Sequence, residues 1–554
     1  MNTEKLTEKV IAQKTKFIIV TGGVCSSLGK GILASSLGVL LKNSGYSLSV
    51  IKWDPYLNVD PGTMSPLVHG EVFVTDDGAE TDLDLGHYER LLGVHLNKYS
   101  SVSSGQIFKE ILDKEREGKF LGRDIQVVPH VVNAIKDRLL HFALKTKVDF
   151  VLVEIGGTVG DMEGISFLEA VRQLKMELER RQLMHCHLSL VPFLSWANEI
   201  KTKPTQHSIM TLKKAGLTPD SLFLRTDKHI DKKSIEKLSI MCGIDEDLIF
   251  EVLTYRPIYK LFLDLKEQEV NKRVQSWFGI KRTKKADLKE WKNLIKLIEN
   301  KKGDIKIGLV AKYVGSNDPY LSVIRALESS GIHAGYNVKI EVIEAEKLSK
   351  DPNCNNDSWK QLKSVHGVVV PGGFDTRGVD GKILATKWAR ENNIPYLGLC
   401  LGMQILLIEF ARNVLKLKGA SSTEFDKKVK YPIISLLEEQ EGIKSKGGTM
   451  RLGVSRCLVK PNSIAGKAYG KKEINERHRH RYEFNNKFKK QFEKAGVLFS
   501  GTYKDKDLVE ISELVNHPFM LGCQFHPEFL STPLEPHPLF DAFIQAVIKK
   551  DFVL

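Results

Sequence analysis

The chain has 554 residues, of which 42% are hydrophobic and 27% charged, proportions that are ordinary for globular protein. Such a length predicts two or more domains, each large enough to bury its own core. The formal net charge of +14 would suit a nucleic-acid partner, but the lysines are spread along the chain without a basic-aromatic module. Since no apolar run reaches the roughly 18 residues of a membrane helix, we expect neither nucleic acid nor a membrane as a partner.

The N-terminus and the cysteines bear on the compartment. Residues 1–15 are polar and acid-bearing, so they resemble neither a signal peptide nor a transit peptide, and we interpret them as an N-terminal extension. The seven cysteines form no CxxC pair. This favours a reducing compartment, the cytoplasm, over a disulfide framework or a zinc site.

A phosphate-binding loop is predicted directly after the first strand. Lys16–Val20 is typical of a short buried strand, and the glycine-rich run Thr21–Gly31 leads into a helical pattern. Backbone N–H groups and a helix N-terminus would face an anion there, and Lys30 would reach its terminal phosphates. The match to GxxxxGK(S/T) is imperfect, because the glycine spacing is too long and Gly31 replaces the hydroxyl residue that usually touches magnesium.

Carboxylates elsewhere must hold magnesium if Gly31 cannot. Asp82 and Asp84 stand in an acidic alternation, and Glu154 ends the strongly apolar run Phe150–Glu154. A carboxylate at the C-terminal end of a parallel strand lies beside the loop where phosphate binds. A solvated surface is the plain alternative for Asp82 and Asp84, whereas an acid that ends a buried strand needs a partner.

The order of patterns predicts an α/β protein of two domains, each a mostly parallel sheet flanked by helices. From residue 16 to 281, apolar strands alternate with helical patterns. Residues 282–302 are basic and partly helical in pattern, as expected of a connector. A second domain, 303–554, opens with the apolar strand Ile305–Val310, and its charged stretch Asp426–Lys430 predicts a surface loop.

Cys400 is the strongest candidate for a catalytic residue. An apolar run reaches Gly398, then follow Gly-x-Cys-x-Gly and helix-forming residues from 403 to 412, the layout of a nucleophile elbow. A cysteine nucleophile needs a base, and His526 offers one with Glu528 two residues along. On a strand these two share a face, so Glu528 would orient His526. For a cysteine and a histidine taken at random from a sequence, an inert buried cysteine is the more common case. Here the flanking glycines and the His-Pro-Glu run favour a catalytic cysteine instead.

These residues resemble a class I glutamine amidotransferase, whose Cys-His-Glu triad hydrolyses glutamine to glutamate and ammonia. Pro371–Phe374 is similar to that family's oxyanion loop, although Asp375 replaces its usual next glycine. Arg481 suits the substrate's α-carboxylate, because a guanidinium forms paired hydrogen bonds with that group. Without the neighbouring motifs, we would interpret Arg477–Arg481 as a solvated basic surface. The resemblance implies a glutamine site made of Gly373, Leu401, Gly402, Met403, Gln404, Glu424 and Arg481.

The N-terminal half resembles the CTP synthase family, and the amidotransferase half matches the same family. The long matching stretches are Lys52–Pro66, His69–Thr75, Asp77–Arg90, Glu154–Asp161 and Lys201–Gln206. The resemblance covers nearly all of the chain from residue 16. It implies an extension (1–15), an amidoligase or synthase domain (16–281), a connector (282–302) and a type 1 glutamine amidotransferase domain (303–554).

The resemblance implies ATP-dependent amination of UTP to CTP, with Mg²⁺ accompanying ATP. ATP would phosphorylate the uracil O4, and ammonia released from glutamine at Cys400, or added as such, would displace the phosphate. GTP as allosteric activator, CTP as feedback inhibitor, a homotetramer formed from dimers, and filaments are further expectations from this family. His69 matches a position that lines the ammonia path.

The resemblance also assigns binding residues. The ATP site would comprise Ser27, Leu28, Gly29, Lys30, Gly31, Ile32 and Asp84. The magnesium ligands would be Asp84 and Glu154. UTP and CTP would contact Ser26, Asp161, Met162, Glu163, Lys201, Thr202, Lys203, Pro204, Thr205, Gln206 and Lys237. The lysines in this set suit a triphosphate, which carries roughly four negative charges.

Two alternatives stay open. Another amidotransferase-coupled P-loop ligase, such as the enzymes that amidate cobyrinic acid, is disfavoured by the segments Asp60–Pro66 and Lys201–Gln206. A non-catalytic scaffold of the same fold would show no glutamine hydrolysis, whereas either ligase would. Substrate choice, UTP against a corrinoid acid, separates the two ligases.

Overall fold

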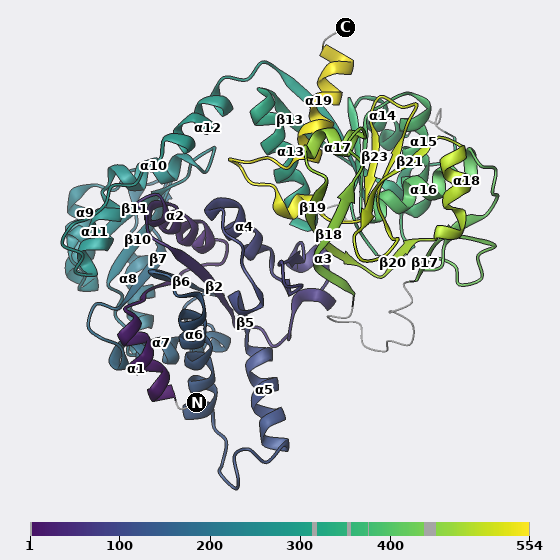
Figure 1. Cartoon of the computed structure of the whole chain (residues 1–554). Helices are drawn as coiled ribbons and strands as arrows, with labels where there is room; N and C mark the ends of the chain where they lie inside the picture. Colours follow the sequence, from purple (N-terminus) through teal and green to yellow (C-terminus); the bar gives the residue numbers. More distant parts are fainter. Residues whose placement is uncertain (1–2, 313–317, 352–355, 375, 437–449, 553–554) are drawn as a thin grey trace. The chain divides into compact units, whose positions relative to one another are not determined.

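The structure is a computed structural model that describes residues 3–312, 318–351, 356–374, 376–436 and 450–552 (Figure 1). The chain forms two compact units. The first contains Met1–Asp60 and His87–Ile295, and the second contains Pro61–Gly86 and Lys296–Leu554. The segment 61–86 therefore belongs to the C-terminal unit, although the chain on both sides of it belongs to the first. None of the described helices combines the length and hydropathy that crossing a bilayer requires.

The first unit is built on a seven-stranded sheet in the order β11-β10-β7-β1-β6-β2-β5, and every pairing in it is parallel. Its strands are β1 (Lys16–Gly22), β2 (Leu48–Asp54), β5 (Ser101–Ser103), β6 (Phe150–Ile155), β7 (Leu183–Leu190), β10 (Ser221–Thr226) and β11 (Ile249–Leu253). The central strands β1 and β6 are buried along nearly their whole length, as expected of parallel strands covered on both faces. The predicted parallel α/β unit is confirmed.

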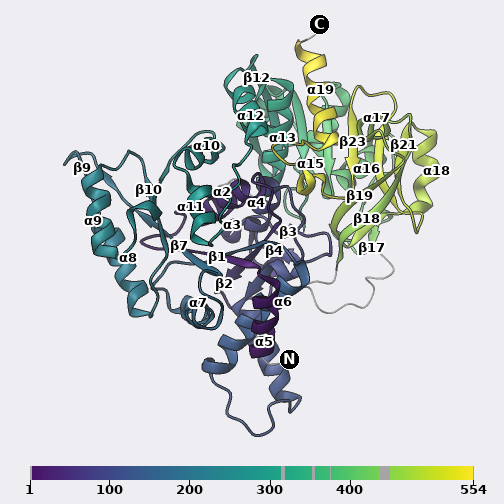
Figure 2. The ribbon, with the colours of Figure 1, turned by 60° about the vertical axis from the view of Figure 1, so that its left-hand side comes forward.

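Helices cover both faces of this sheet (Figures 1 and 2). The helices in this part of the chain are α1 (Thr3–Gln13), α2 (Lys30–Lys42), α4 (Leu83–Leu92), α5 (Ser104–Arg116), α6 (Val132–Thr146), α7 (Ile165–Glu177), α8 (Lys203–Lys214), α9 (Lys232–Cys242), α10 (Lys260–Glu267), α11 (Val270–Trp277) and, in the connector, α12 (Lys289–Glu299). Helices α4 and α12 each cross a unit boundary. A small hairpin, β8 (Phe193–Leu194) with β9 (Glu199–Ile200), precedes α8.

The N-terminal extension and the connector, which lie outside the sheet, each form a helix that packs through a few apolar side chains. The N-terminal extension forms α1, which packs against α6 through the buried Leu6 and Val10. The connector contains α12, whose Trp291 ring lies 4.8 Å from the Phe262 ring, edge to face. Both segments are polar on average, so their anchors consist of a few apolar residues at helical spacing.

The second unit carries a nine-stranded sheet in the order β13-β12-β14-β15-β23-β22-β21-β18-β19. Its strands are β12 (Asp304–Ala311), β13 (Asn337–Glu344), β14 (Gly367–Val370), β15 (Tyr396–Leu399), β18 (Arg451–Val459), β19 (Glu473–His480), β21 (Val497–Tyr503), β22 (Val509–Leu514) and β23 (Met520–Cys523). Pairing is parallel from β13 to β23 and antiparallel from β23 to β19. The short links β21–β22 and β22–β23 explain this change, because a parallel crossover needs a dozen or more residues.

The helices of the second unit enclose two apolar clusters, one on each side of β12, β14 and β15. They are α3 (Pro66–His69), α13 (Leu321–Ala334), α14 (Asp357–Lys363), α15 (Val379–Glu391), α16 (Leu401–Asn413), α17 (Ile464–Tyr469), α18 (Lys489–Lys494) and α19 (Pro538–Phe552). Three further strands form a small sheet, β16 (Ala420–Ser422), β17 (Tyr431–Leu436) and β20 (Tyr482–Phe484). The hairpin β3 (Phe73–Val74) with β4 (Glu80–Thr81) completes the unit. Asp426–Lys430 lies between β16 and β17 outside any helix or strand, which confirms the predicted loop.

Candidate active site

Cys400 occupies a strained turn between β15 and α16. Its backbone has φ 51° and ψ −101°, a left-handed conformation that side-chain-bearing residues rarely adopt. Glycines flank it because the chain is packed against itself there. A Cβ on Gly398 would lie 2.6 Å from the carbonyl of Gly402, and one on Gly402 would lie 2.0 Å from the Val370 oxygen. The nucleophile elbow predicted from Gly-x-Cys-x-Gly is confirmed as a backbone geometry.

His526 and Glu528 form the buried pair expected of a base and its orienting acid. Glu528 Oε1 lies 2.7 Å from His526 Nδ1, and both side chains are at least nine-tenths buried. The strand geometry used to predict this contact is wrong. Strand β23 ends at Cys523, and His526 precedes a 3₁₀ turn, Pro527–Leu530, which brings the Glu528 carboxylate round to the imidazole.

The charge state of His526 is set by its neighbours. Burial lowers the pKa of the imidazole, but the Glu528 carboxylate and the Cys400 sulfur outweigh it and raise that pKa to about 10. The ring is therefore protonated at neutral pH and faces the Cys400 sulfur as a cation. With Nδ1 held by Glu528, Nε2 is the nitrogen available to exchange a proton with the Cys400 sulfur.

A glycine loop lies next to this pair. Strand β14 ends at Val370, and a Cβ on Gly372 would lie 2.9 Å from His526 Cε1 and 3.7 Å from Cys400 Cβ. Only a residue without a side chain lets backbone N–H groups approach the reacting atoms so closely. Asp375, the departure noted in the sequence, lies outside the described residues.

A pocket opens onto the sulfur. Its walls carry residues of the elbow, the glycine loop, strand β19 and the segment 61–86, all within the second unit. The residues that line it are Pro66, Glu71, Val72, Pro319, Tyr320, Val323, Pro371, Gly372, Gly373, Phe374, Cys400, Arg479, His526, Glu528 and Phe529.

Backbone carbonyls of strand β19 contact both Cys400 and His526. The Arg479 carbonyl oxygen lies 3.8 Å from Cys400 Sγ, and the Arg477 carbonyl accepts from the His526 N–H at 2.8 Å. Arg477, His478 and His480 are buried, so the interpretation of this run as a solvated basic surface is wrong.

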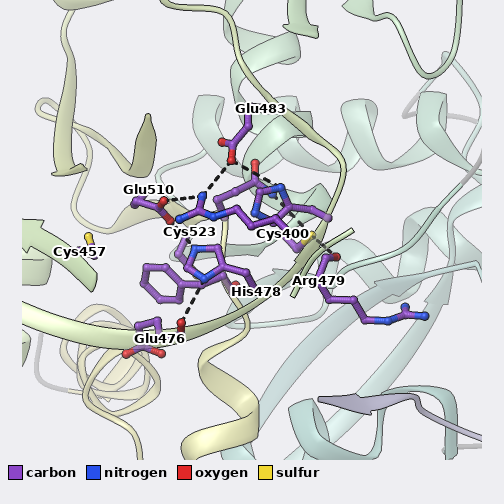
Figure 3. Close-up of polar contacts among 12 residues, drawn as sticks. Cys400, Cys457, Glu476, His478, Arg479, Glu483, Glu510 and Cys523 are labelled. Carbon is purple, nitrogen blue, oxygen red and sulfur yellow. Dashed lines mark hydrogen bonds and ion pairs between the residues drawn. The ribbon is translucent and has the colours of Figure 1, made fainter. Parts of the chain in front are cut away.

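His478 of β19 faces a buried ionic cluster (Figure 3), and His480 Nδ1 lies 3.6 Å from Glu483 of the same cluster. His478 Nε2 lies 2.6 Å from Glu510, and Arg451 Nη1 lies 2.8 Å from Glu510 and 2.9 Å from Glu483. Burial opposes the charge of Glu510, but His478 and Arg451 outweigh it and lower the pKa of that carboxyl. Burial, with the charge of Glu510, raises the pKa of Glu483 to about 8.

Sequence reasoning missed this cluster. Its only sequence signal is acids inside strands that are otherwise apolar, such as Glu510 in Val509–Leu514, together with the alternation of arginine and histidine in Arg477–Arg481. Period-2 alternation places the arginines and the histidines on opposite faces of one strand.

The predicted glutamine residues gather around the elbow. Leu401, Gly402, Met403 and Gln404 form the first turn of α16. Gln404 Nε2 donates to the Tyr482 carbonyl at 3.0 Å and lies 3.2 Å from the Gln524 side-chain oxygen. Burial raises the pKa of Tyr482, the charge of Glu424 raises it further and that of Arg481 opposes, which places both residues near this tyrosine.

The phosphate loop of the first unit has the predicted strand–loop–helix form. Gly29 adopts φ 100° and Lys30 begins α2. Lys30 Nζ donates to the Gly157 carbonyl at 2.6 Å, and the Val159 N–H donates to the Gly22 carbonyl at 2.8 Å. The loop is thus joined to the segment that follows β6. Of the predicted ligands on it, Ser26 and Ser27 are exposed and Leu28 is buried.

Helix α8 packs against the same loop. A Cβ on Gly23 would lie 1.7 Å from Ser208 Oγ of α8. The predicted nucleotide segment 201–206 forms the start of this helix, with Gln206 Nε2 donating to the Thr202 hydroxyl at 3.1 Å. Asp161 accepts from the Thr158 N–H at 2.7 Å, and Met162 is exposed. The structure thereby brings the phosphate loop, residues 156–161 and the start of α8 together, whereas Lys237 lies exposed on α9.

Glu154 has the partners that an acid at a buried strand end needs. Its carboxylate accepts from Lys52 Nζ at 2.9 Å and from the Tyr88 hydroxyl. Asp84 lies one turn before Tyr88 on the same helix, α4. The described residues hold no cluster of three or more His, Cys, Asp or Glu side chains that could bind a metal by themselves. His69 ends α3 and is exposed.

Comparisons with known proteins cover both units. A family model described as CTP synthase N-terminus matches residues 16–280, and one described as glutamine amidotransferase class-I matches residues 317–546. The CTP synthase of Bacillus subtilis (strain 168) is 49% identical over 97% of this chain and 99% of its own length. That of Halalkalibacterium halodurans is 49% identical over 97% of this chain and 100% of its own. A solved glutaminase domain of Trypanosoma brucei CTPS, with bound acivicin, is 37% identical, covers 45% of this chain and 95% of that chain, and has a TM-score of 0.41.

Proposed function

The chain belongs to the CTP synthase family, and from this premise we propose how its residues divide the reaction. The enzyme is a ligase that aminates UTP to CTP with ATP, using ammonia from the hydrolysis of glutamine. Family membership favours this reaction over the other P-loop ligases and over the scaffold that the sequence left open.

The buried triad beside a glycine loop is the observation that supports the glutaminase assignment. Cys400 attacks the side-chain amide carbon of glutamine as a thiolate, while backbone N–H groups near Gly372 and Gly373 stabilise the oxyanion. His526 gives its proton to the departing ammonia and then takes one from the water that cleaves the thioester. Glu528 holds the imidazole in orientation and stabilises its charge. Glutamine and water thereby become glutamate and ammonia.

Residues around the elbow would hold the substrate. Arg481 would pair with the α-carboxylate and Glu424 with the α-ammonium of glutamine, as the charges of a free amino acid require. Their joint influence on Tyr482 supports placing both charges near that tyrosine, whose carbonyl accepts from Gln404 of the elbow helix. Gly373, Leu401, Gly402, Met403 and Gln404 complete the proposed glutamine site.

The first unit would bind the nucleotides. Lys30, the backbone N–H groups of the glycine-rich loop 26–32 and the N-terminus of α2 suit the ATP phosphates. Lys201–Gln206, Ser26, Asp161–Glu163 and Lys237 are proposed to hold UTP, and CTP as feedback inhibitor. The hydrogen bonds that join the phosphate loop to residues 156–161 support one continuous nucleotide site.

Magnesium fits the donor set at this end of the sheet. Mg²⁺ prefers oxygen ligands and is typically bound by one or two carboxylates together with substrate phosphates. Glu154 supplies a buried carboxylate whose present partners are a lysine and a tyrosine, and Asp84 stands one turn from that tyrosine on α4. Asp84 and Glu154 are the proposed ligands. The ion would neutralise charge on the phosphoryl group that is transferred from ATP and on the phosphates that remain in ADP.

Further family properties stay proposals for this chain. They are activation by GTP, inhibition by CTP, assembly into homotetramers from dimers and into filaments, passage of ammonia by His69, and a cytoplasmic setting. Large exposed apolar side chains of the first unit, Leu121, Met162 and Trp196, support contacts between subunits. Six of the seven cysteines lie in described residues and are free, which supports a reducing compartment.

CTP formation from UTP, ATP and Mg²⁺, with glutamine or ammonium chloride as the nitrogen source, tests the proposal. Product from both sources is expected, and GTP should raise the glutamine-dependent rate. Product from ammonia alone would contradict the glutaminase assignments. No product from either source, from folded protein, would overturn the synthase assignments.

A further inference from the structure

The hairpin of residues 73–81 contacts the machinery that holds His526. The hairpin lies within the part of the sequence that matches the N-terminal family model, 16–280, yet it packs into the second unit. Its strands β3 and β4 pair through Phe73–Thr81 and Val74–Glu80. Both ends of the segment 61–86 are covalently continuous with the first unit.

Arg477 joins this hairpin to the catalytic base. Its guanidinium is fully buried, donates from Nε to Asp76 Oδ1 at 2.6 Å and from Nη1 to the Val74 carbonyl at 3.1 Å. The guanidinium also lies 5.3 Å from the centre of the Phe73 ring. The carbonyl of the same residue accepts the backbone N–H of His526 at 2.8 Å.

Aromatic contacts form a second connection between the hairpin and His526. The Phe529 ring stacks on the His526 imidazole, with centroids 5.1 Å apart and planes 14° apart. Phe73 meets Phe529 edge to face at 5.0 Å. Both phenylalanines are buried. Phe73 therefore supports the imidazole plane through Phe529, while Asp76 anchors the strand whose carbonyl fixes the backbone of His526.

The second half of the hairpin holds the strand near the nucleophile. Arg479 donates from Nε to Glu80 at 2.9 Å, and its carbonyl oxygen is the one 3.8 Å from Cys400 Sγ. Because alternate side chains of a strand point to the same face, Arg477 and Arg479 of β19 both contact the hairpin of residues 73–81. The Arg477 guanidinium is fully buried, although Asp76 is 39% exposed, and Glu80 is buried beside Arg479. With one partner of each pair buried, these bonds constrain the strand more than fully exposed ion pairs would.

We propose that Phe73 and Asp76 are positioning residues for His526: the hairpin sets the depth and plane of the catalytic imidazole through Phe529 and Arg477. The proposal rests on the function of His526 as the glutaminase base. It predicts that residues encoded in the synthase half of the sequence determine the rate of glutamine hydrolysis without touching glutamine.

Steady-state kinetics of the full-length enzyme test this. Asp76→Asn and Phe73→Leu are expected to lower the glutaminase kcat about tenfold or more, because small misplacement of a catalytic group has effects of this size. The KM for glutamine should stay within about twofold, since binding groups are unchanged. Asp76→Glu should restore most of kcat. Asp77→Asn is the neighbouring control, because the Asp77 carboxylate accepts from the Thr75 hydroxyl at 2.7 Å within the hairpin itself.

A second readout needs no turnover. Iodoacetamide labelling of Cys400 is followed by mass spectrometry of its peptide, because Cys25 is exposed and will react as well. In the wild type the imidazolium lies beside the Cys400 sulfur and favours its reaction, and the time course of modification at one pH is the labelling profile. In Asp76→Asn and Phe73→Leu the modification should be slower than in the wild type, because the displaced imidazole no longer faces the sulfur.

Ammonia-dependent CTP formation distinguishes positioning from misfolding. It should be unchanged in both variants. A parallel loss of both activities, or unchanged kcat and labelling profile in both variants, would overturn the proposal. Failure of the proposed function is a separate result: wild-type enzyme would then hydrolyse no glutamine, or would keep hydrolysing it after Cys400 is alkylated.

Discussion

Lys52 and Glu154 are register partners on the adjacent parallel strands β2 and β6, and their charges meet at 2.9 Å. The two side chains are only 5% and 4% exposed. Such a pair is poorly solvated, so each charge depends on the other. The carboxylate proposed to bind magnesium is therefore paired with a cation from a neighbouring strand of the sheet.

Glu154→Gln should destabilise the first unit by about 3–5 kcal/mol, because the buried Lys52 ammonium loses its 2.9 Å ion pair and keeps Asp54 at the longer distance of 3.9 Å. The double variant Lys52→Met with Glu154→Gln should recover much of that stability while remaining inactive in CTP formation. Urea denaturation and the ammonia-dependent assay measure the two effects. Recovery of activity in the double variant would remove Glu154 from the magnesium site.

Cys400→Ala should abolish CTP formation from glutamine and leave formation from added ammonia unchanged, because only the nucleophile of the second unit is lost. The spectroscopic assay with each nitrogen source checks this. Equal loss of both activities in folded protein would contradict two separable sites.

Glu528→Gln should lower the glutaminase kcat by roughly 10²–10⁴, because the imidazole loses its orienting charge. The ammonia-dependent reaction is the internal control. A kcat within about twofold of wild type would show that Glu528 has no orienting role.

The same substitution should change how stability depends on pH. The folded-state pKa of His526, about 10, lies above the ordinary value of 6.5. A group of this kind stabilises the fold fully below the lower value, and its contribution is lost as pH rises through the higher one. The free energy of unfolding of the second unit should therefore decline between about pH 6.5 and pH 10, and less steeply in Glu528→Gln. Denaturant titrations across this range measure both slopes.

Gly372→Ala should impair glutamine hydrolysis strongly, because the new Cβ would lie 2.9 Å from His526 Cε1. Gly303→Ala is the matched control in the same unit, since its Cβ would meet no heavy atom of the described residues closer than 3.9 Å. Glutaminase kinetics and a thermal melt distinguish a local effect from unfolding. Equal activity of the two variants would contradict the proposed approach of the glycine loop to the imidazole.

Local patterns in the sequence were enough to predict the phosphate loop and the nucleophile elbow. Both depend on residues adjacent in the chain: a strand, glycines that permit left-handed or crowded backbone, and a helix start. The structure has these elements where the sequence placed them, with Lys30 opening α2 and Cys400 between β15 and α16. The parallel first sheet followed from the same alternation of strands and helices.

The tertiary structure alone decided the surroundings of the catalytic pair. Sequence spacing suggested that His526 and Glu528 share a strand face, but a 3₁₀ turn joins them. The run from Arg477 to Arg481 has the composition of a solvated surface, and it is buried because acids from distant segments neutralise it. Asp76 is 401 positions from Arg477 in the sequence. Burial of a charge depends on which partner the fold delivers, and no local pattern encodes a partner so far along the chain.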